Sequence, residues 1–303
     1  MGTVIEKIAW AGWPNCYRIA NDEVEIVVTS DIGPRIMHYS FQGGRNFFKI
    51  FESQKGKSGE PDWQTRGGHR IWVAPETRER TYAPDNGAVS IEIRGTTLVA
   101  TQPVELLTGI RKQLVIDMAA AGTEVTVLHR LQNTLPFAQT FAPWALSMLT
   151  PGGTGITGFP ARGRHEDHLS PTNPLVMWAF TNLTDKRWTF LEKYLVLRHD
   201  PAAPVATKLG HFNPDTWGAY LLGSELFLKR YKADPSGTYP DMGCSWESFA
   251  NADMLEIETL GPLAEVAPGD WLEHTERWSL HRDITVPEWT DAGLDRALSA
   301  TLV

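Results

Sequence analysis

The stretch TEVTVLHRLQN, Thr123 to Asn133, decides the fold class because its residues alternate in character with a period of two. This alternation is typical of a half-buried antiparallel strand, in which successive side chains point to opposite faces. Similar runs recur along the chain: CYRIA, EVEIVVT, AVSIEIRG, TTLVATQ, IRKQLVID, GAYLLG, ELFLKRY, DMLEIETL and WLEHTERWSL. Most of them are bounded by Gly, Pro, Asn or Asp, which mark turns. The sequence therefore predicts a mainly β protein built from antiparallel strands.

Two other segments complete the expected organisation. The C-terminal stretch VPEWTDAGLDRALSATLV carries Trp289, Leu294 and Leu298 roughly on one helical face, which predicts a short capping helix. The segment Thr150 to Pro174 is the richest in turn formers and predicts a long surface loop. Strand-like runs continue on both sides of this loop, so we expect a single domain over residues 1–303.

The charge balance and composition exclude several classes of protein. The 303 residues include 36 acidic and 28 basic ones, giving a formal charge of -8, and no Lys/Arg run could follow a phosphate backbone. We therefore expect neither nucleic acid nor a membrane as partner. No apolar run approaches the roughly 20 residues that span a bilayer, and the N-terminus lacks the features of a signal peptide. With only Cys16 and Cys244, a disulfide scaffold is not expected either. These features favour a soluble, cytoplasmic protein and leave its oligomeric state open.

The stretch RGGHRIWVAPE, Arg66 to Glu76, is the first candidate for a functional segment. Its paired glycines let the backbone turn where a side chain would clash. Arg, His, Trp and Glu side chains together can bind a sugar or carry out acid–base chemistry. The same string could also form a buried turn.

Four stretches, in this order, resemble the aldose 1-epimerase (galactose mutarotase-like) superfamily: EVEIVVTSDIGPRIMHYSFQGGRNFFKI, RGGHRIW, HRLQNTLPFAQTFAPWALSML and MLEIETLGPLAEVAPGDWLEHTERWSL. The resemblance extends from about Asn21 to Leu280. It implies a galactose mutarotase-like antiparallel β-supersandwich, to which the short C-terminal helix is added. It also implies a sugar as ligand and a reaction that needs a Glu base and a His acid, with no metal and no cofactor.

Two residues compete for the role of the base. Glu256 and Glu258 are spaced two apart, so both should leave a strand on the same face and raise the pKa of each other. Glu256 matches the Leu-Glu step of the family and Glu258 matches its Glu-Thr step. We favour Glu258 slightly, and the alternative is that both are exposed carboxylates on a solvated strand face.

The sequence lacks the His that serves as the acid in the family. The family carries a His on the strand that follows the central turn, but the corresponding stretch AQTFAPWALSM contains none, and Trp144 lies near the expected place. His69 is the best substitute, because it lies in the segment that resembles the lining of the sugar cleft. It could act as the acid or as a sugar ligand.

Further residues are candidates for binding the substrate. Arg66 and Arg70 could bind a carboxylate or phosphate of an acidic or phosphorylated sugar. Glu76 could orient His69 or bind a hydroxyl, and Trp72 could pack or stack. The remaining candidates are Lys208 and His211, in an expected turn, and Trp246, at an expected cleft rim.

The leading hypothesis is an aldose epimerase or mutarotase that acts on a free or acidic sugar. One alternative is a non-catalytic carbohydrate-binding protein, and another is a lyase or other acid–base enzyme on uronate-type glycans. The string RHEDH, with His165 and His168, is interpreted as part of a solvated loop rather than as a metal site.

Overall fold

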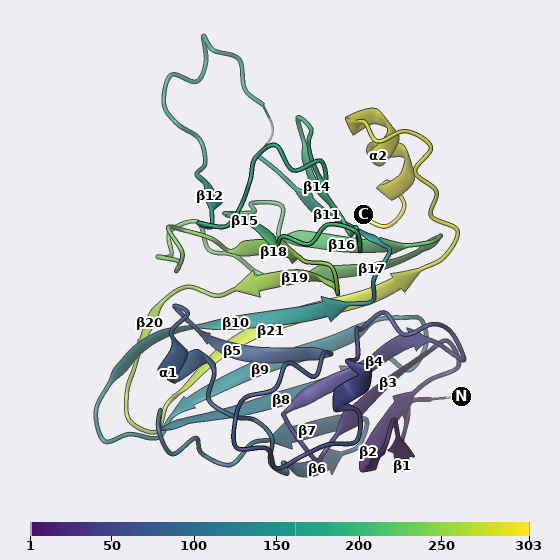
Figure 1. Ribbon diagram of the computed structural model, residues 1–303, viewed down its shortest axis with the longest axis vertical. Helices are drawn as coiled ribbons and strands as arrows, with labels where there is room; N and C mark the ends of the chain where they lie inside the picture. Colours follow the sequence, from purple (N-terminus) through teal and green to yellow (C-terminus); the bar gives the residue numbers. More distant parts are fainter. Residues whose placement is uncertain (1, 161, 303) are drawn as a thin grey trace.

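The computed structural model describes residues 2–160 and 162–302, and its strands form two antiparallel sheets (Figure 1). The helices are short: η1 (Glu52–Gln54), α1 (Arg78–Thr81) and α2 (Asp291–Leu298). None of the described helices is long and apolar enough to cross a membrane. The predicted β class and the predicted C-terminal helix are both confirmed, since α2 begins after the capping residue Thr290 and packs Leu294 and Leu298 against the second sheet.

The first sheet runs in the order β1 (Val4–Trp10), β2 (Trp13–Ala20), β3 (Val24–Thr29), β4 (Arg35–Phe41), β5 (His69–Ala74), β10 (Gln139–Leu149), β19 (Leu255–Leu260), β18 (Trp246–Ala250), β15 (Thr207–His211) and β12 (Leu175–Met177), with β20 (Ala264–Val266) paired to β10. The second sheet runs in the order β13 (Trp188–Phe190), β14 (Tyr194–Arg198), β11 (Thr154–Gly158), β16 (Trp217–Leu222), β17 (Glu225–Arg230), β21 (Trp271–His281), β9 (Val125–Asn133), β8 (Ile110–Met118), β7 (Thr97–Thr101) and β6 (Ser90–Arg94).

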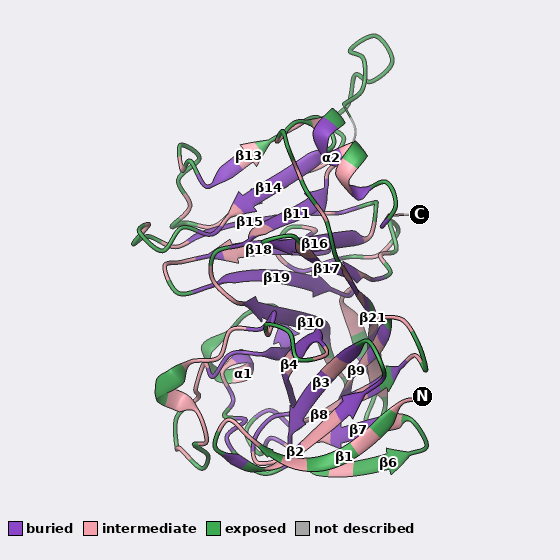
Figure 2. Ribbon diagram, turned by 90° about the vertical axis from the view of Figure 1, so that its right-hand side faces the viewer, coloured by how far each residue is buried: buried purple, intermediate pink, exposed green. Residues whose placement is uncertain are grey.

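The main core lies between the two sheets. Along β9 every second residue is buried, as the alternation of the opening stretch predicts, and Val125, Val127 and Leu131 are fully buried. Burial of each such side chain contributes roughly 1.5–3 kcal/mol relative to an exposed one. In the first sheet the strands β5, β10 and β19 are buried almost throughout, whereas β1 and β6 at the periphery of the two sheets are largely exposed (Figure 2). One face of each sheet thus packs against the other sheet.

The predicted loop from Thr150 to Pro174 is wrong in its first part. Strand β11 lies within it, paired between β14 and β16 in the second sheet. The glycines there serve close packing rather than turning: a Cβ on Gly155 would lie 3.3 Å from Leu255, and one on Gly153 would lie 2.4 Å from the ring of Tyr220. The exposed loop follows β11, and its residues 162–174 extend away from the body of the protein (Figure 2).

Strand register places alternate residues of β5, β10 and β19 on opposite faces of the first sheet. Leu146 on β10 pairs with Arg70 on one side and Glu258 on the other, so these three side chains share the outer face. The next residue, Ser147, pairs with His69 and Ile257, and these three share the inner face, which packs on the second sheet. This division decides which side chains can meet in a site.

Candidate functional site

A cavity of about 280 Å³ opens on the outer face of the first sheet. Strands β5, β10, β15, β18 and β19 form its floor, and the segments that connect strands form its walls. Its lining consists of Trp63, Thr65, Arg70, Trp72, Glu76, Tyr82, Trp144, Leu146, Met148, Trp178, Phe180, Lys208, Phe249, Met254 and Glu256. We call this cavity the inner pocket.

Aromatic rings make up much of the inner pocket. The centroid of the Trp72 ring lies 5.5 Å from Trp63, 5.1 Å from Tyr82 and 5.2 Å from Trp144. Tyr82 and Trp144 meet Trp72 edge to face, an arrangement that stabilises aromatic clusters beyond their buried area. The pocket therefore offers rigid, flat, apolar surfaces next to polar groups, which is the lining that small polar ligands with apolar faces require.

Arg70 is a buried cation in this pocket with unused donors. Its guanidinium lies 3.9 Å from the Trp72 ring centroid and 5.1 Å from that of Trp63, and its side chain donates to the carbonyl oxygen of Thr65 at 3.2 Å. Among the described residues, none accepts a hydrogen bond from its Nε and no carboxylate lies within 4.0 Å. Burial and the nearby Arg35 lower the pKa of Arg70 to about 10, so the guanidinium stays charged at neutral pH. It is available for an anionic or hydroxyl group of a ligand.

Lys208 is held in the pocket by two carboxylates. Its Nζ lies 2.6 Å from Glu247 Oε2 and 2.8 Å from Glu258 Oε2. It also lies 4.7 Å from the ring centroids of both Trp144 and Trp178. Burial alone would lower the pKa of Lys208, but Glu247 and Glu258 raise it above its ordinary value. Because an ammonium has three N–H donors, one remains for a ligand.

Glu256 is the buried carboxylate that lines the inner pocket, whereas the other lining carboxylate, Glu76, is exposed. Burial and the neighbouring Glu258 raise the pKa of Glu256 to about 7. Its Oε1 is buried and has no hydrogen-bond partner in the described part of the chain. Such a group is present in both protonation states at neutral pH, as acid–base catalysis requires.

Glu258 lies behind the pocket lining rather than in it. It is fully buried, and its Oε2 accepts hydrogen bonds from Trp144 Nε1 at 2.7 Å and from Lys208 Nζ at 2.8 Å. These contacts suit an ionised carboxylate that fixes the positions of its two neighbours. As predicted, Glu256 and Glu258 share one face of β19, but only Glu256 lines the cavity.

The structure brings together six of the residues singled out from the sequence: Arg70, Trp72, Glu76, Trp144, Lys208 and Glu256 all line the inner pocket. Lys208 does so from strand β15 rather than from the expected turn. Glu76 lies at the exposed mouth and accepts a hydrogen bond from the hydroxyl of Tyr82, not from His69.

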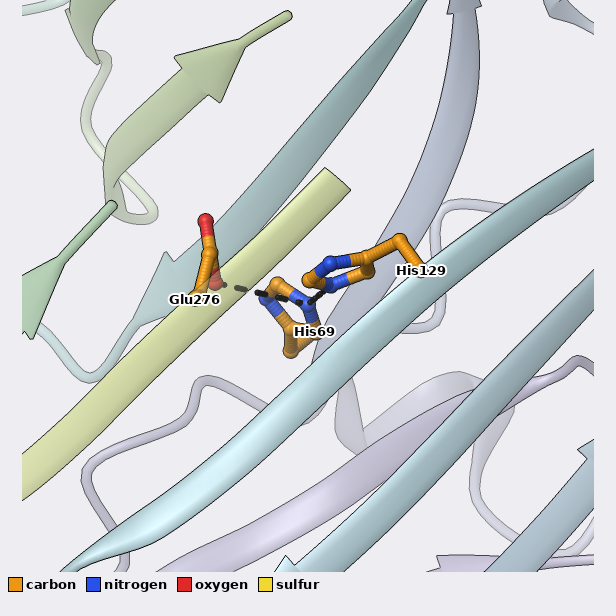
Figure 3. Close-up of side chains that lie close together, drawn as sticks. All are labelled: His69, His129 and Glu276. Carbon is orange, nitrogen blue, oxygen red and sulfur yellow. Dashed lines mark hydrogen bonds and ion pairs between the residues drawn. The ribbon is translucent and has the colours of Figure 1, made fainter. Parts of the chain in front are cut away.

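The predicted pairing of His69 with Glu258 is wrong. The two side chains lie on opposite faces of the first sheet, because His69 pairs with Ser147 on the inner face while Glu258 pairs with Leu146 on the outer face. The His69 imidazole points between the sheets, where His129 and Glu276 approach it (Figure 3). It cannot transfer a proton to a ligand in the inner pocket.

A hydrogen-bonded chain satisfies His69 between the sheets. His129 Nδ1 donates to the carbonyl oxygen of His274 at 2.9 Å, so a neutral His129 accepts at Nε2 from His69 Nε2, 2.6 Å away. His69 Nδ1 then accepts from the hydroxyl of Ser147 at 2.8 Å. Burial holds the pKa of both His69 and His129 below the ordinary value, so these imidazoles are neutral.

The same cluster has the residue types of a metal site. One ligand atom each of His69, His129 and Glu276 lies within 4.8 Å of the others. The two Nε2 atoms, however, are 2.6 Å apart, closer than the roughly 3.3 Å expected for two nitrogens at tetrahedral zinc distances. The Lys229 ammonium also lies 3.0 Å from Glu276. The geometry fits a hydrogen-bonded network better than a coordination shell.

The sequence interpretation expected Arg66 to anchor the sugar, but the structure places this residue elsewhere. It is fully buried and donates to the carbonyl oxygens of Gln54 and Lys57 and to the side chains of Glu60 and Asn86. It therefore fixes the loop before β5 and does not line the inner pocket.

His211 and Trp246 point inward because they have the opposite strand parity to Lys208 and Glu247. His211 packs edge to face on Phe159 at 5.3 Å, and burial lowers its pKa to about 4. Trp246 is fully buried and donates through Nε1 to Ser248 at 2.9 Å. Neither residue lines the inner pocket.

Several pocket residues escaped the sequence interpretation. Most lie on loops: Trp63, Thr65, Tyr82, Trp178 and Phe180. No local pattern indicates that such residues meet. Glu247 does not line the pocket, but it contacts Lys208 from β18, because alternation makes it face away from its neighbour Trp246.

No protein-family model and no curated protein matches the chain. Solved structures do match it in fold. A galactose mutarotase-related enzyme from Lactobacillus acidophilus superposes with a TM-score of 0.57 at 9% identity, covering 91% of this chain and 98% of that one. A galactose mutarotase-like protein from Clostridium acetobutylicum gives a TM-score of 0.56 at 9% identity, covering 93% and 99%. A galactose mutarotase-like protein from Lactobacillus casei gives 0.55 at 9% identity, covering 88% and 100%. The fold is thus that of galactose mutarotase-like proteins, as the resemblance predicted.

Proposed function

We propose that the protein binds the reducing end of an aldose in the inner pocket and interconverts its two anomers. The observation that carries this proposal is Glu256, a carboxylate with a pKa of about 7 inside an aromatic pocket. Of the ionisable side chains that line the pocket, Arg70 and Lys208 stay protonated at neutral pH. The fold shared with mutarotase-like proteins supports the same reaction, although fold alone does not fix an activity.

In this proposal one carboxylate moves the proton in both directions. Ionised Glu256 takes the proton from the anomeric hydroxyl, the C1–O1 bond becomes a carbonyl, and the C1–O5 bond breaks with its electron pair on O5. Glu256 then gives the proton to O5. After the aldehyde rotates about C1–C2, the reverse steps close the ring on the other face. The reaction balances in atoms and charge. It does not require an acid such as the His that the family carries on the strand after the central turn.

The two cations would stabilise the negative charge that develops on the sugar oxygens. Lys208 has one donor left after binding Glu247 and Glu258, and a preorganised donor in a water-poor site is worth more than one in water. Arg70 would bind a carboxylate elsewhere on the sugar, which favours an acidic aldose. Glu258, the slightly favoured base in the sequence interpretation, would hold Lys208 and Trp144 in place.

A second candidate is a carbohydrate-binding protein without catalysis. It is favoured by the lining of the inner pocket, in which the described residues include many aromatic rings but no imidazole. It predicts binding without exchange of anomers. Because Arg70 is unpaired, an acid–base enzyme on uronates, such as a lyase, remains the third candidate.

The test is magnetisation-exchange NMR between anomers of neutral and acidic aldoses. We expect the wild type to accelerate exchange and Glu256→Gln to lose about 100-fold or more of that rate. Glu265→Gln, an exposed carboxylate on β20, is the matched control and should retain full activity. Binding without exchange would favour the carbohydrate-binding candidate, and absence of both would remove the proposal.

A further inference from the structure

A second cavity, of about 710 Å³, adjoins the inner pocket. Glu76, Tyr82 and Trp178 line both cavities, so the two are continuous. Thr77, Arg78 and Asp241 line only the second cavity, which we call the outer groove. The space open to a ligand therefore continues beyond the mouth of the inner pocket into the outer groove.

The relative sizes of the two cavities set how large a ligand the site suits. Cavities that enclose drug-sized ligands measure about 300–1,000 Å³. The inner pocket, at about 280 Å³, falls just below that range and suits a single sugar ring. The outer groove lies within the range and would stay empty if the ligand were a monosaccharide.

We propose that the outer groove is a second glycosyl subsite, so that the substrate is a reducing disaccharide or longer saccharide whose reducing unit lies in the inner pocket. This inference rests on the proposed function. The glycosidic bond would cross the boundary formed by Glu76, Tyr82 and Trp178.

The boundary is already held in place without a ligand. The hydroxyl of Tyr82 donates to Glu76, and the Trp178 ring lies against the Lys208 ammonium at 4.7 Å. Trp178 fits closely because position 210 is a glycine: a Cβ there would lie 3.3 Å from the Trp178 ring. A fixed aromatic wall binds a sugar at little cost in side-chain entropy.

Asp241 gives the outer groove a directed carboxylate. It has a φ of 51°, and Met242, which follows it, has a φ of 60°. Such non-glycine conformations are strained and tend to occur where a function requires them. The turn is secured by the amides of Gly243 and Cys244, which both donate to the carbonyl oxygen of Pro240 at 3.0 Å.

The chemistry of the groove suits sugar hydroxyls. The Asp241 side chain is partly buried, and burial raises its pKa. A carboxylate can accept hydrogen bonds from two hydroxyls, and the Arg78 guanidinium offers donors on the same groove. Acceptor, donor and aromatic wall together match the alternating polar and apolar faces of a second sugar ring.

The test compares matched mono- and disaccharides in the exchange assay: glucose with maltose and cellobiose, and galacturonate with digalacturonate. For one of these pairs we expect kcat/KM to be about tenfold or more higher for the disaccharide, a difference of about 1.4 kcal/mol. Asp241→Ala should abolish that preference, so that kcat/KM for the disaccharide falls to the value for the monosaccharide. Asp283→Ala is the matched control, because Asp283 also has a positive φ, 60°, and lines neither cavity.

Arg78→Ala, at the exposed start of α1, provides a second variant in case Asp241→Ala does not fold. If monosaccharides are exchanged as fast as every disaccharide and neither variant changes the ratio, the second subsite is wrong while the proposed function stands. If the wild type exchanges no saccharide of either size, the proposed function fails and the subsite fails with it.

Discussion

His69 and Arg70 are adjacent in the chain, and their side chains project from opposite faces of the first sheet. His69 lies 2.6 Å from His129 between the sheets, and Arg70 lies 3.9 Å over Trp72 in the inner pocket. Substitutions at these two positions should therefore have separable effects. We expect His69→Gln to lower the free energy of unfolding by about 1–3 kcal/mol, because Ser147 and His129 lose a partner, with little effect on sugar binding.

Arg70→Gln should show the reverse pattern. No described carboxylate is paired with the guanidinium, so its removal leaves no ion orphaned, and the free energy of unfolding should change by less than about 1 kcal/mol. Affinity for acidic aldoses should fall by about tenfold or more. Urea unfolding and tryptophan fluorescence titration measure the two quantities. Equal effects of both variants on both readouts would contradict the division of faces.

The rate of anomer exchange should rise with pH through about 7. Ionised Glu256 is the form that accepts the anomeric proton, and its pKa is raised to about 7. Below that pH the rate should fall by about tenfold per unit, and above it the rate should level off. Arg70 lowers the pKa of Glu256, so Arg70→Gln should move the midpoint upward. A rate that falls as pH rises through 7 would mean that the protonated carboxyl is the active form.

Lys208→Met should be strongly destabilising at pH 8. It leaves Glu247 and Glu258 buried without their shared cation, and breaking a buried ion pair costs about 3–5 kcal/mol. Adding Glu258→Gln removes one orphaned charge and keeps an acceptor for Trp144, so the double variant should recover part of the loss. Lys193→Met, at an exposed ion pair, should change the urea midpoint little. If the double variant is less stable than Lys208→Met, the two residues are not coupled as described.

Stability should fall as the pH drops below about 6.5. Burial lowers the pKa of His69, His129, His211 and His274, that of His211 to about 4 and that of His274 to about 3, so the unfolded chain binds protons that the folded chain does not. Each such group costs up to about 1.4 kcal/mol per pH unit.

Glu256 opposes this loss over part of the range. Its raised pKa means that the folded chain binds a proton between pH 7 and about 4.3 that the unfolded chain does not. Urea unfolding between pH 7.5 and 5 measures the net slope. Glu256→Gln should steepen the loss, whereas His165→Gln, in the exposed loop, should leave the slope unchanged. A wild-type curve that is flat over this range would contradict the neutral state of these buried imidazoles.

Gly218→Ala should destabilise the core by about 1–3 kcal/mol or more. A Cβ at this position would lie 1.9 Å from the Trp246 ring, which is fully buried between the sheets. Gly87→Ala is the control, since a Cβ there meets nothing within 4 Å. Thermal unfolding of the two variants distinguishes steric overlap from a general intolerance of substitution.

The strands could be predicted because alternation is a local property. In β9 and β8 the period of two is visible without knowledge of the neighbours. Strand β11 was missed for the opposite reason: Gly155 within it and Gly153 just before it are required by Leu255 and Tyr220, which lie far along the chain. Local sequence does not distinguish a glycine that turns from one that makes room.

Strand parity and the resemblance to the aldose 1-epimerase superfamily predicted only part of the candidate site. They singled out Arg70, Trp72, Trp144 and Glu256, which the structure brings together in the inner pocket. They misplaced His69, because alternation shows that it and Arg70 face opposite ways but not which face is internal. That choice depends on His129 and Glu276 in the second sheet, 60 positions and more away.

The contacts between the sheets also have a mechanical consequence. Apolar surfaces can slide over one another with little penalty, but a hydrogen bond fixes two atoms in direction and distance. Such bonds between the first sheet and the second include His69 to His129, Thr259 to both His274 and Glu276, and Lys229 to the carbonyl oxygen of Ile257. They resist shear between the layers directly beneath β5 and β19. The floor of the inner pocket is therefore stiff, and any adjustment to a ligand must come from the loops that carry Trp63 and Trp178.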